Sequence, residues 1–336
     1  MKLLGRIVAY GLLALVLVPV LAWAATALRI DGPSSPGLAQ GLAGGFLAVV
    51  VGILALVRPL RRGLGIVAVL WLVVLGWWLR IPARNDRDWQ TDVARPAHVI
   101  PDGDRVTIQN VRNFDYRSET DFTEHWEDRS YDLSQVQGAD LFVSYWGPTL
   151  IAHTIMSWEF ADGRHLAISI ETRKEKGETY SALLGFFRQY ELYYVVADER
   201  DVVRLRTNVR GEQVFLYRLR ARPALARAAL ESYLKEVDHL DHKPEWYNAF
   251  THNCTTTIRG HVQEAGVHNP LDWRLLVNGK GDELLYERGN IDTSLPFAEM
   301  RAKSDVTAKA KAADQDPAFS ERIRVDLPPR PLPLTK

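Results

Sequence analysis

The stretch LIAHTIMSWEFADGRHLAISIETR, residues 150–173, decides the fold of the water-soluble part of this chain. Two runs, 151–160 and 165–173, alternate apolar with polar residues around a polar turn, which is the pattern of a β-hairpin. Around it the same reasoning predicts strands at 105–112, 140–147, 193–197, 202–208 and 213–219, and helices at 180–190, at 223–240 and from Cys254 to Gly266. The sequence therefore predicts an α+β domain with an antiparallel sheet.

The length of the hairpin loop decides which polar side chains share a face. Each strand carries one polar set with a spacing of two: His153, Ser157 and Glu159 in the first strand, and Ser169, Glu171 and Arg173 in the second. A two-residue turn at Asp162-Gly163 would put the two sets on opposite faces. A three-residue loop with Gly163 as its left-handed residue would pair 153 with 173 and 157 with 169, and make Glu171 a diagonal neighbour of His153.

Cys254 is the single cysteine, which excludes an internal disulfide. It lies in the run Thr251–Thr257, whose residues are mostly of helix-capping type, so a helix is predicted to begin within a residue or two of it. The positive end of a helix stabilises a thiolate. Backbone N–H groups at that end, around Asn253 and Thr255, could also hold the oxyanion formed when a thiolate attacks an acyl carbonyl. The alternative is an inert cysteine packed in the core.

A nucleophilic cysteine needs a base, and His153 is the candidate because it is a histidine at the start of an apolar strand. Glu171 could orient its imidazole as the third member of a triad. The alternatives are that His153 is a satisfied core histidine and that Glu171 pairs with Arg173 or Arg188. Ser157, Ser169 and Arg173 are weaker neighbours of the site.

Other chemistries have less support in the sequence. No G-x-S-x-G elbow is present, which argues against a serine nucleophile. His252, Cys254 and His261 do not have a standard zinc spacing, so no metal is expected, and no cofactor is expected. Four histidines are predicted to lie on solvated helix or loop positions: His239, His242, His261 and His268.

The first 80 of the 336 residues form a membrane anchor. They hold only eight charged side chains, whereas the remainder holds 34 Lys/Arg and 40 Asp/Glu. Three apolar runs suit transmembrane helices at about 7–28, 39–57 and 63–80. The acidic remainder argues against nucleic acid as a partner. The alternatives are a signal peptide cleaved near Ala24 and a buried helical hairpin.

The basic residues predict the orientation of this anchor. Lys2 and Arg6 precede the first run, and Arg58, Arg61 and Arg62 lie between the second and third. The positive-inside rule then places the N-terminus in the cytoplasm. Residues 81–300 are expected to form a catalytic domain outside the membrane. The polar segment 301–336 is expected to be largely disordered.

Several segments of the body resemble the Lnb N-terminal periplasmic domain family. They are NVRNFDYRS (110–118), AHT (152–154), ISIETR (168–173), VADERD (196–201), LRT (205–207) and NCTT (253–256). The resemblance covers about residues 85–300.

The resemblance implies a permuted papain-like, NlpC-type fold, in which the histidine precedes the cysteine. It also implies a bacterial inner-membrane protein with a periplasmic domain, and a lipoprotein N-acyltransferase chemistry. In that chemistry Cys254 is the nucleophile and His153 the base, acting on a membrane phospholipid or a lipoprotein. The alternatives are a cysteine peptidase or amidase acting on cell-wall peptide, and a non-catalytic envelope binding or assembly module. The distance between the Cys254 sulfur and the His153 ring distinguishes an enzyme from a non-catalytic module, because catalysis requires the two groups to come within hydrogen-bond reach.

Overall fold

The computed structural model describes residues 2–147, 149–251, 253–267, 270, 272–275 and 278–333. The chain forms two compact units: Met1–Ala83 with Ser181–Tyr190, and Arg84–Tyr180 with Glu191–Lys336. We call the first the anchor and the second the body.

The anchor contains three helices that are long and apolar enough to cross a membrane. They are α1 (Lys2–Ile30), α2 (Pro36–Leu56) and α3 (Leu60–Leu79), and their apolar segments have mean hydropathies of 2.4, 2.1 and 1.9. The predicted spans agree with these helices within a few residues. At the end of α1, Asp31 accepts a hydrogen bond from Trp78 Nε1 at 2.7 Å.

Residues 181–190 belong to the anchor although they come from the middle of the chain. The backbone N–H of Arg188 donates to Asp31, and Phe187 shares a small core with Ala27 and Trp78. The helix predicted over 180–190 is therefore wrong. Only a short 3-10 turn forms, Leu184–Phe186, because the segment follows its contacts with the anchor.

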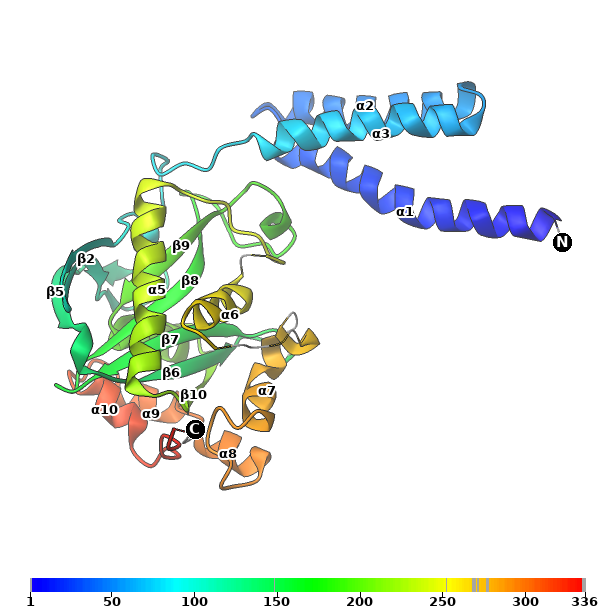
Figure 1. Ribbon diagram of the computed structural model, residues 1–336. Coiled ribbons are helices and arrows are strands. Elements are labelled where there is room, and N and C mark those ends of the chain that lie inside the picture. The colour runs from blue at the N-terminus through cyan, green and yellow to red at the C-terminus, as the bar shows by residue number, and fades with distance from the viewer. Residues whose placement is uncertain are drawn as a thin grey trace. The chain divides into compact units, whose positions relative to one another are not determined.

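The body is built on an eight-stranded sheet (Figure 1). The path of hydrogen-bonded neighbours is β1-β2-β9-β8-β7-β6-β10, and β5 pairs with β2. The strands are β1 (His98–Asp102), β2 (Arg105–Arg112), β5 (Trp126–Asp132), β6 (Val136–Tyr145), β7 (His153–Phe160), β8 (His165–Arg173), β9 (Glu191–Ala197) and β10 (Gln213–Arg218). All pairs are antiparallel except β2 with β9. The strands β3 (Asp115–Tyr116) and β4 (Phe122–Thr123) form a separate pair. The predicted α+β class and the mostly antiparallel sheet are confirmed.

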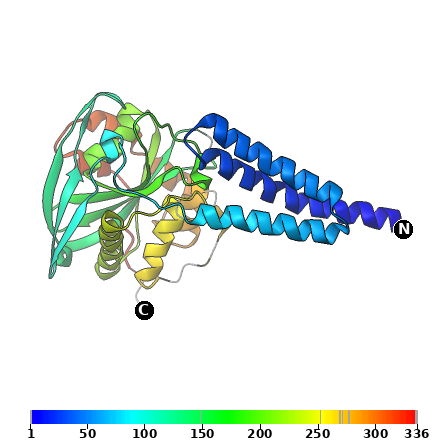
Figure 2. The same cartoon turned by 90° about the horizontal axis from the view of Figure 1, so that it is seen from above.

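Helices cover both faces of this sheet. On one face lie α5 (Pro223–His242) and α6 (Cys254–Glu264), which Figures 1 and 2 show against the central strands. On the other lie α4 (Glu199–Arg204), α9 (Thr307–Ala313) and α10 (Phe319–Arg324). The remaining helices, α7 (Gly281–Glu287) and α8 (Phe297–Lys303), follow α6 in the chain. Alternate residues of β7 and β8 thus enter two different cores.

Of the two loops considered, the hairpin β7–β8 has the three-residue one, but with a shifted register. Gly163 has a φ of +82°, which only glycine adopts readily, and Phe160 N–H bonds to Arg164 O. The observed pairs are Ile155 with Ser169 and Ser157 with Ala167, so the predicted pairing of 153 with 173 is wrong by two residues. Because a shift of two preserves the faces, His153 and Glu171 still lie on one side of the sheet.

Residues 202–208, predicted as a strand, are helical. Asp198 caps α4 by accepting from Arg200 N, and a π-helical turn, Leu205–Val209, continues it. The helix is fixed by tertiary pairing, since the carboxylate of Asp201 is fully buried against the guanidinium of Arg112 at 2.7 Å.

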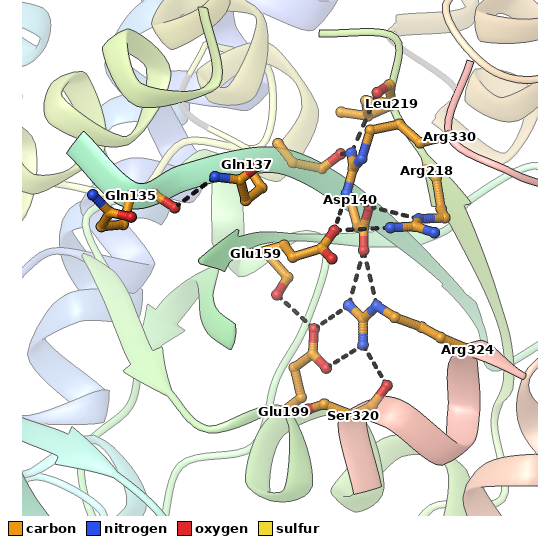
Figure 3. A network of polar contacts seen from close by, with 12 residues as sticks. Gln135, Gln137, Asp140, Glu159, Glu199, Arg218, Leu219, Ser320, Arg324 and Arg330 are labelled. Carbon is orange, nitrogen blue, oxygen red and sulfur yellow. Dashed lines mark hydrogen bonds and ion pairs between the residues drawn. The ribbon is translucent and has the colours of Figure 1, made fainter. Parts of the chain in front are cut away.

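The C-terminal segment is folded over the residues described, 301–333, so the predicted disorder is wrong. Val306, Phe319 and Ile323 are completely or almost completely buried. Arg324 binds Asp140 at 2.9 Å and Glu199 at 2.6 Å, and Arg330 binds Asp140 at 2.8 Å (Figure 3). The composition of this segment suggests disorder, but Arg324 and Arg330 compensate buried carboxylates of the sheet and of α4.

Candidate active site

Cys254 is the first residue of α6, at a fully capped helix start. The side-chain oxygen of Asn253 accepts from the N–H groups of Thr255 at 3.0 Å and Thr256 at 2.9 Å. Thr256 Oγ1 in turn accepts from the backbone N–H of Asn253, which completes a capping box. The N–H groups near Thr255 that we expected to hold an oxyanion are therefore occupied by this cap.

His153 is the first residue of β7, and its ring and the Cys254 thiol are close enough to shift each other's pKa. Its Nε2 lies 2.7 Å from Ser169 Oγ and 3.1 Å from Glu171 Oε1. Ser169 Oγ donates its one hydrogen to Glu171 Oε1 at 2.7 Å, so it can only accept from the ring. Nε2 therefore carries the proton of the neutral ring, and Nδ1 is the nitrogen that can take the proton of the thiol.

Glu171 is held in turn by a buried guanidinium. Arg206 donates to Glu171 Oε1 at 2.8 Å and to Glu212 Oε2 at 3.1 Å. Ser144 Oγ donates to Glu212. A polar chain thus runs from Cys254 through His153, Glu171 and Arg206 to Glu212. Sequence reasoning included Arg206 only as part of a resemblance motif and gave it no role, because the π-helical turn that points it inward was predicted as a strand.

The charges in this series of polar side chains favour an ion pair between the thiolate of Cys254 and the imidazolium of His153. Burial opposes ionisation of the thiol, but the hydrogen bond and the charge of His153 outweigh it and lower the pKa of Cys254 to about 7. Burial and the Arg206 charge act to lower the pKa of His153, but Glu171 and the bond to Cys254 overcome them and raise it. Glu171 itself is partly buried, and the charges of His153 and Arg206 hold its pKa well below the usual range.

Asn278 is a site residue that sequence reasoning missed. Its side chain is 8% exposed, and Nδ2 lies 3.5 Å from Cys254 Sγ and 2.9 Å from Thr255 Oγ1. Its Oδ1 accepts from the backbone N–H of Ala152 at 2.9 Å, which fixes the orientation of the amide. A side chain at the next residue, Gly279, would overlap the backbone of residues 149–151. The dipeptide Asn278-Gly279 ordinarily indicates a turn, so the sequence contained no signal that Asn278 lies beside Cys254.

Burial raises the pKa of three tyrosines, and the charge of Cys254 adds to the rise: Tyr180, Tyr233 and Tyr247. Tyr233 is almost fully buried in the core that also contains Cys254, and Tyr180 is 52% exposed. The thiol therefore has aromatic neighbours both in the core and at the surface.

Two expected neighbours of the site lie elsewhere. Ser157 Oγ donates to Glu199 Oε1 at 2.5 Å, and Figure 3 shows Glu199 within the ionic network around Arg324. Arg173 is buried under Trp89 and donates to the backbone oxygens of Val93 and Ala94, so its role is structural. Ser169 is the one weaker candidate that the structure places beside His153.

His261 of α6 is also buried, which corrects the expectation of a solvated position. His261 Nε2 lies 2.7 Å from Tyr194 Oη, and its Nδ1 lies 2.7 Å from Ser232 Oγ. Burial lowers the pKa of His261 to about 4. His252 and His268 lie outside the described residues.

Two groups of side chains within the described residues have the spacing of metal ligands: His98 with Asp241 and His242, and Asp140 with Glu159 and His165. Neither group includes Cys254 or His153. In the second, the carboxylates of Asp140 and Glu159 are bound by Arg330.

Residues 122–279, somewhat less than half of the chain, match the family model of the Lnb N-terminal periplasmic domain. The match contains every member of the polar chain and Asn278, and it confirms the resemblance over a shorter range than the 85–300 expected. No curated protein and no solved structure matches the chain. With its three apolar helices, the chain is a membrane-anchored protein with a periplasmic domain.

Proposed function

We propose that this protein is a thiol acyltransferase of the bacterial inner membrane, with Cys254 as nucleophile and His153 as base. The observation that carries the proposal is the series Cys254, His153 and Glu171 at a capped helix start. In this series His153 overcomes the effect of burial and lowers the pKa of the thiol to about 7, and Glu171 lies 3.1 Å from the imidazole. A cysteine kept only for packing needs no such partners. The family and the anchor support an acyl donor that resides in the membrane, such as a phospholipid or a lipoprotein.

In the first half-reaction the thiolate sulfur forms a bond to the acyl carbon of an ester, and the carbonyl electron pair moves onto oxygen. When this oxyanion collapses, the ester C–O bond breaks. The leaving alkoxide takes the proton held on Nδ1 of His153, and a thioester remains on Cys254.

In the second half-reaction an amine nitrogen attacks the thioester carbon. The nitrogen gives its proton to Nδ1, the C–S bond breaks, and the thiolate returns. Water in place of the amine would make the protein a hydrolase. A lipoprotein N-terminal amine is the acceptor that the family resemblance implies.

Two donors beside the sulfur suit the oxyanion. Asn278 Nδ2 lies 3.5 Å from Sγ, so an oxygen on the carbon bonded to Sγ would fall within its reach. The second is the backbone N–H of Cys254, which the Asn253 cap does not use. These donors replace the N–H groups near Thr255 in the mechanism.

The test uses the full chain in nanodiscs containing a phospholipid with a labelled acyl chain. Intact-protein mass spectrometry should show an acyl adduct that hydroxylamine removes, and that is absent in Cys254→Ala. A labelled chain on Cys254→Ala, or no adduct on the wild type while Cys254 still alkylates readily, would refute lipid acyl transfer. The second outcome would turn attention to peptide substrates.

A further inference from the structure

Most of the exposed apolar side chains of the body lie on segments that contribute to the site. Nine large ones are exposed among the described residues of the body, by 42% to 85%. Six of them lie on segments that contribute to the site: Trp146, Leu150, Ile151, Tyr180, Phe250 and Trp273. The other three, Ile100, Val325 and Leu332, lie outside these segments. We call the six residues the apolar rim.

Contacts join most of these segments to Cys254. Leu150 O accepts from Gly279 N at 3.1 Å, and Ala152 N donates to Asn278, which in turn contacts the sulfur. Trp273 is linked to the same segment, because its ring lies 5.9 Å from Nζ of Lys280, which is two residues after Asn278. Phe250 lies four residues before Cys254, and the charge of Cys254 adds to the burial that raises the pKa of Tyr180. The rim therefore belongs to the approaches to the nucleophile.

We propose that the apolar rim inserts into the outer leaflet of the bilayer, so that an acyl chain passes from lipid to Cys254 without crossing water. Large exposed apolar groups are costly in water unless a partner covers them. Tryptophan and tyrosine are the side chains that membrane interfaces favour. This inference deepens the proposed function and rests on it for the nature of the substrate.

The partner is lipid rather than another protein because the chain carries its own bilayer contact. Tyr180 of the rim is followed at once by residues 181–190, which pack within the anchor. Phe187 of that segment shares a core with Ala27 and Trp78. The chain therefore joins the anchor at both ends of this segment as well as at the end of α3.

The first experiment needs no catalysis. Full-length Cys254→Ala is placed in nanodiscs whose phospholipid carries a diazirine in its acyl chain, illuminated, digested and mapped by mass spectrometry. Adducts are expected in the peptides of the rim, and not at Ile100 or Val325. Body adducts that are absent, or as frequent at Ile100 and Val325 as in the rim, would overturn the proposal.

The second experiment compares matched variants of the active chain. Ile151→Ser should slow acylation of Cys254 by bilayer lipid about tenfold, because Ile151 belongs to the apolar rim. Ile100→Ser is the matched control, because it also removes one exposed isoleucine but lies outside the rim, and it should leave the acylation rate unchanged. Both should keep the iodoacetamide reactivity of Cys254. Equal acylation rates in Ile151→Ser and Ile100→Ser would overturn the proposal that the rim delivers the acyl chain. Cross-links to the rim without any acyl adduct on the wild type would retain the rim and refute the proposed chemistry instead.

Discussion

Replacing His153 by alanine tests the electrostatics of the site directly. In the wild type the pKa of Cys254 lies at about 7, below its ordinary 9.0, because the bond and charge of His153 outweigh burial. The alanine variant keeps the burial and loses its largest compensation, so the thiol pKa should return to 9.0 or above. A lowered thiol pKa means that the thiolate is present above about pH 7 and is lost as pH falls through that value. In the variant the thiolate should appear two units higher.

The size of the effect follows from that shift. At pH 7 about half of the wild-type thiol is ionised, against about 1% of a thiol with a pKa of 9, so the reactive fraction falls about 50-fold. Two pKa units correspond to about 2.7 kcal/mol. A thiolate of higher pKa is intrinsically more nucleophilic, so the rate at high pH can exceed that of the wild type. The midpoint of the rate profile, rather than one rate, is therefore the quantity to measure.

The assay is alkylation of the single cysteine by iodoacetamide between pH 5 and 10, followed by intact-protein mass spectrometry. His165→Ala is the matched control, because His165 has the same 9% exposure on the same hairpin but no hydrogen-bond partner among the described residues. The control should keep a midpoint near 7. A midpoint that stays near 7 in His153→Ala, or that moves equally in both variants, would refute the reasoning.

Three further predictions concern the groups around this pair. Asn278→Ala should lower the rate of acyl transfer by about 10²–10³-fold while iodoacetamide still alkylates Cys254, as expected for an oxyanion donor; a change in alkylation alone would contradict that role. Arg206→Met leaves Glu171 and Glu212 without their shared partner. It should therefore reduce the free energy of unfolding, measured by urea titration, by about 3–5 kcal/mol. Arg322→Met at an exposed ion pair is the control and should reduce it by less than about 1 kcal/mol. Gly138→Ala places a Cβ against the guanidinium of Arg330, so hydrogen exchange should rise in residues 325–333; Gly281→Ala, which has open space, is the control, and equal exchange in both would show that Arg330 does not secure this segment.

Local patterns predicted the elements that bury one regular face. The alternation in 151–160 and 165–173 indicated the β7–β8 hairpin, and Gly163 indicated the loop length. The capping residues around Cys254 indicated where α6 begins. These features depend on neighbours in the sequence, so the sequence shows them.

The errors fall where distant charges decide the local structure. The valine-rich run after Asp201 looks like a strand, but the pairing of Asp201 with Arg112 and the cap at Asp198 make it helical. The C-terminal residues look too polar to fold, but Arg324 and Arg330 meet carboxylates more than 100 residues away. Asn278 likewise reaches Cys254 only through the fold. A single sequence contains no signal for such pairs.

The alternation of charge along the polar chain explains why a site of this kind includes Arg206. A carboxylate partly buried beside His153 without compensation would raise its own pKa and take up a proton, and it would then polarise the imidazole weakly. Arg206 prevents this by holding the pKa of Glu171 down, although its positive charge by itself lowers the pKa of His153. Glu212 offsets that cost, because it takes the other end of the guanidinium at 3.1 Å. The reactivity of Cys254 therefore depends on a balance of three ionised groups behind the imidazole. Glu212→Gln should consequently shift the alkylation midpoint of Cys254 without touching any atom of the thiol–imidazole pair.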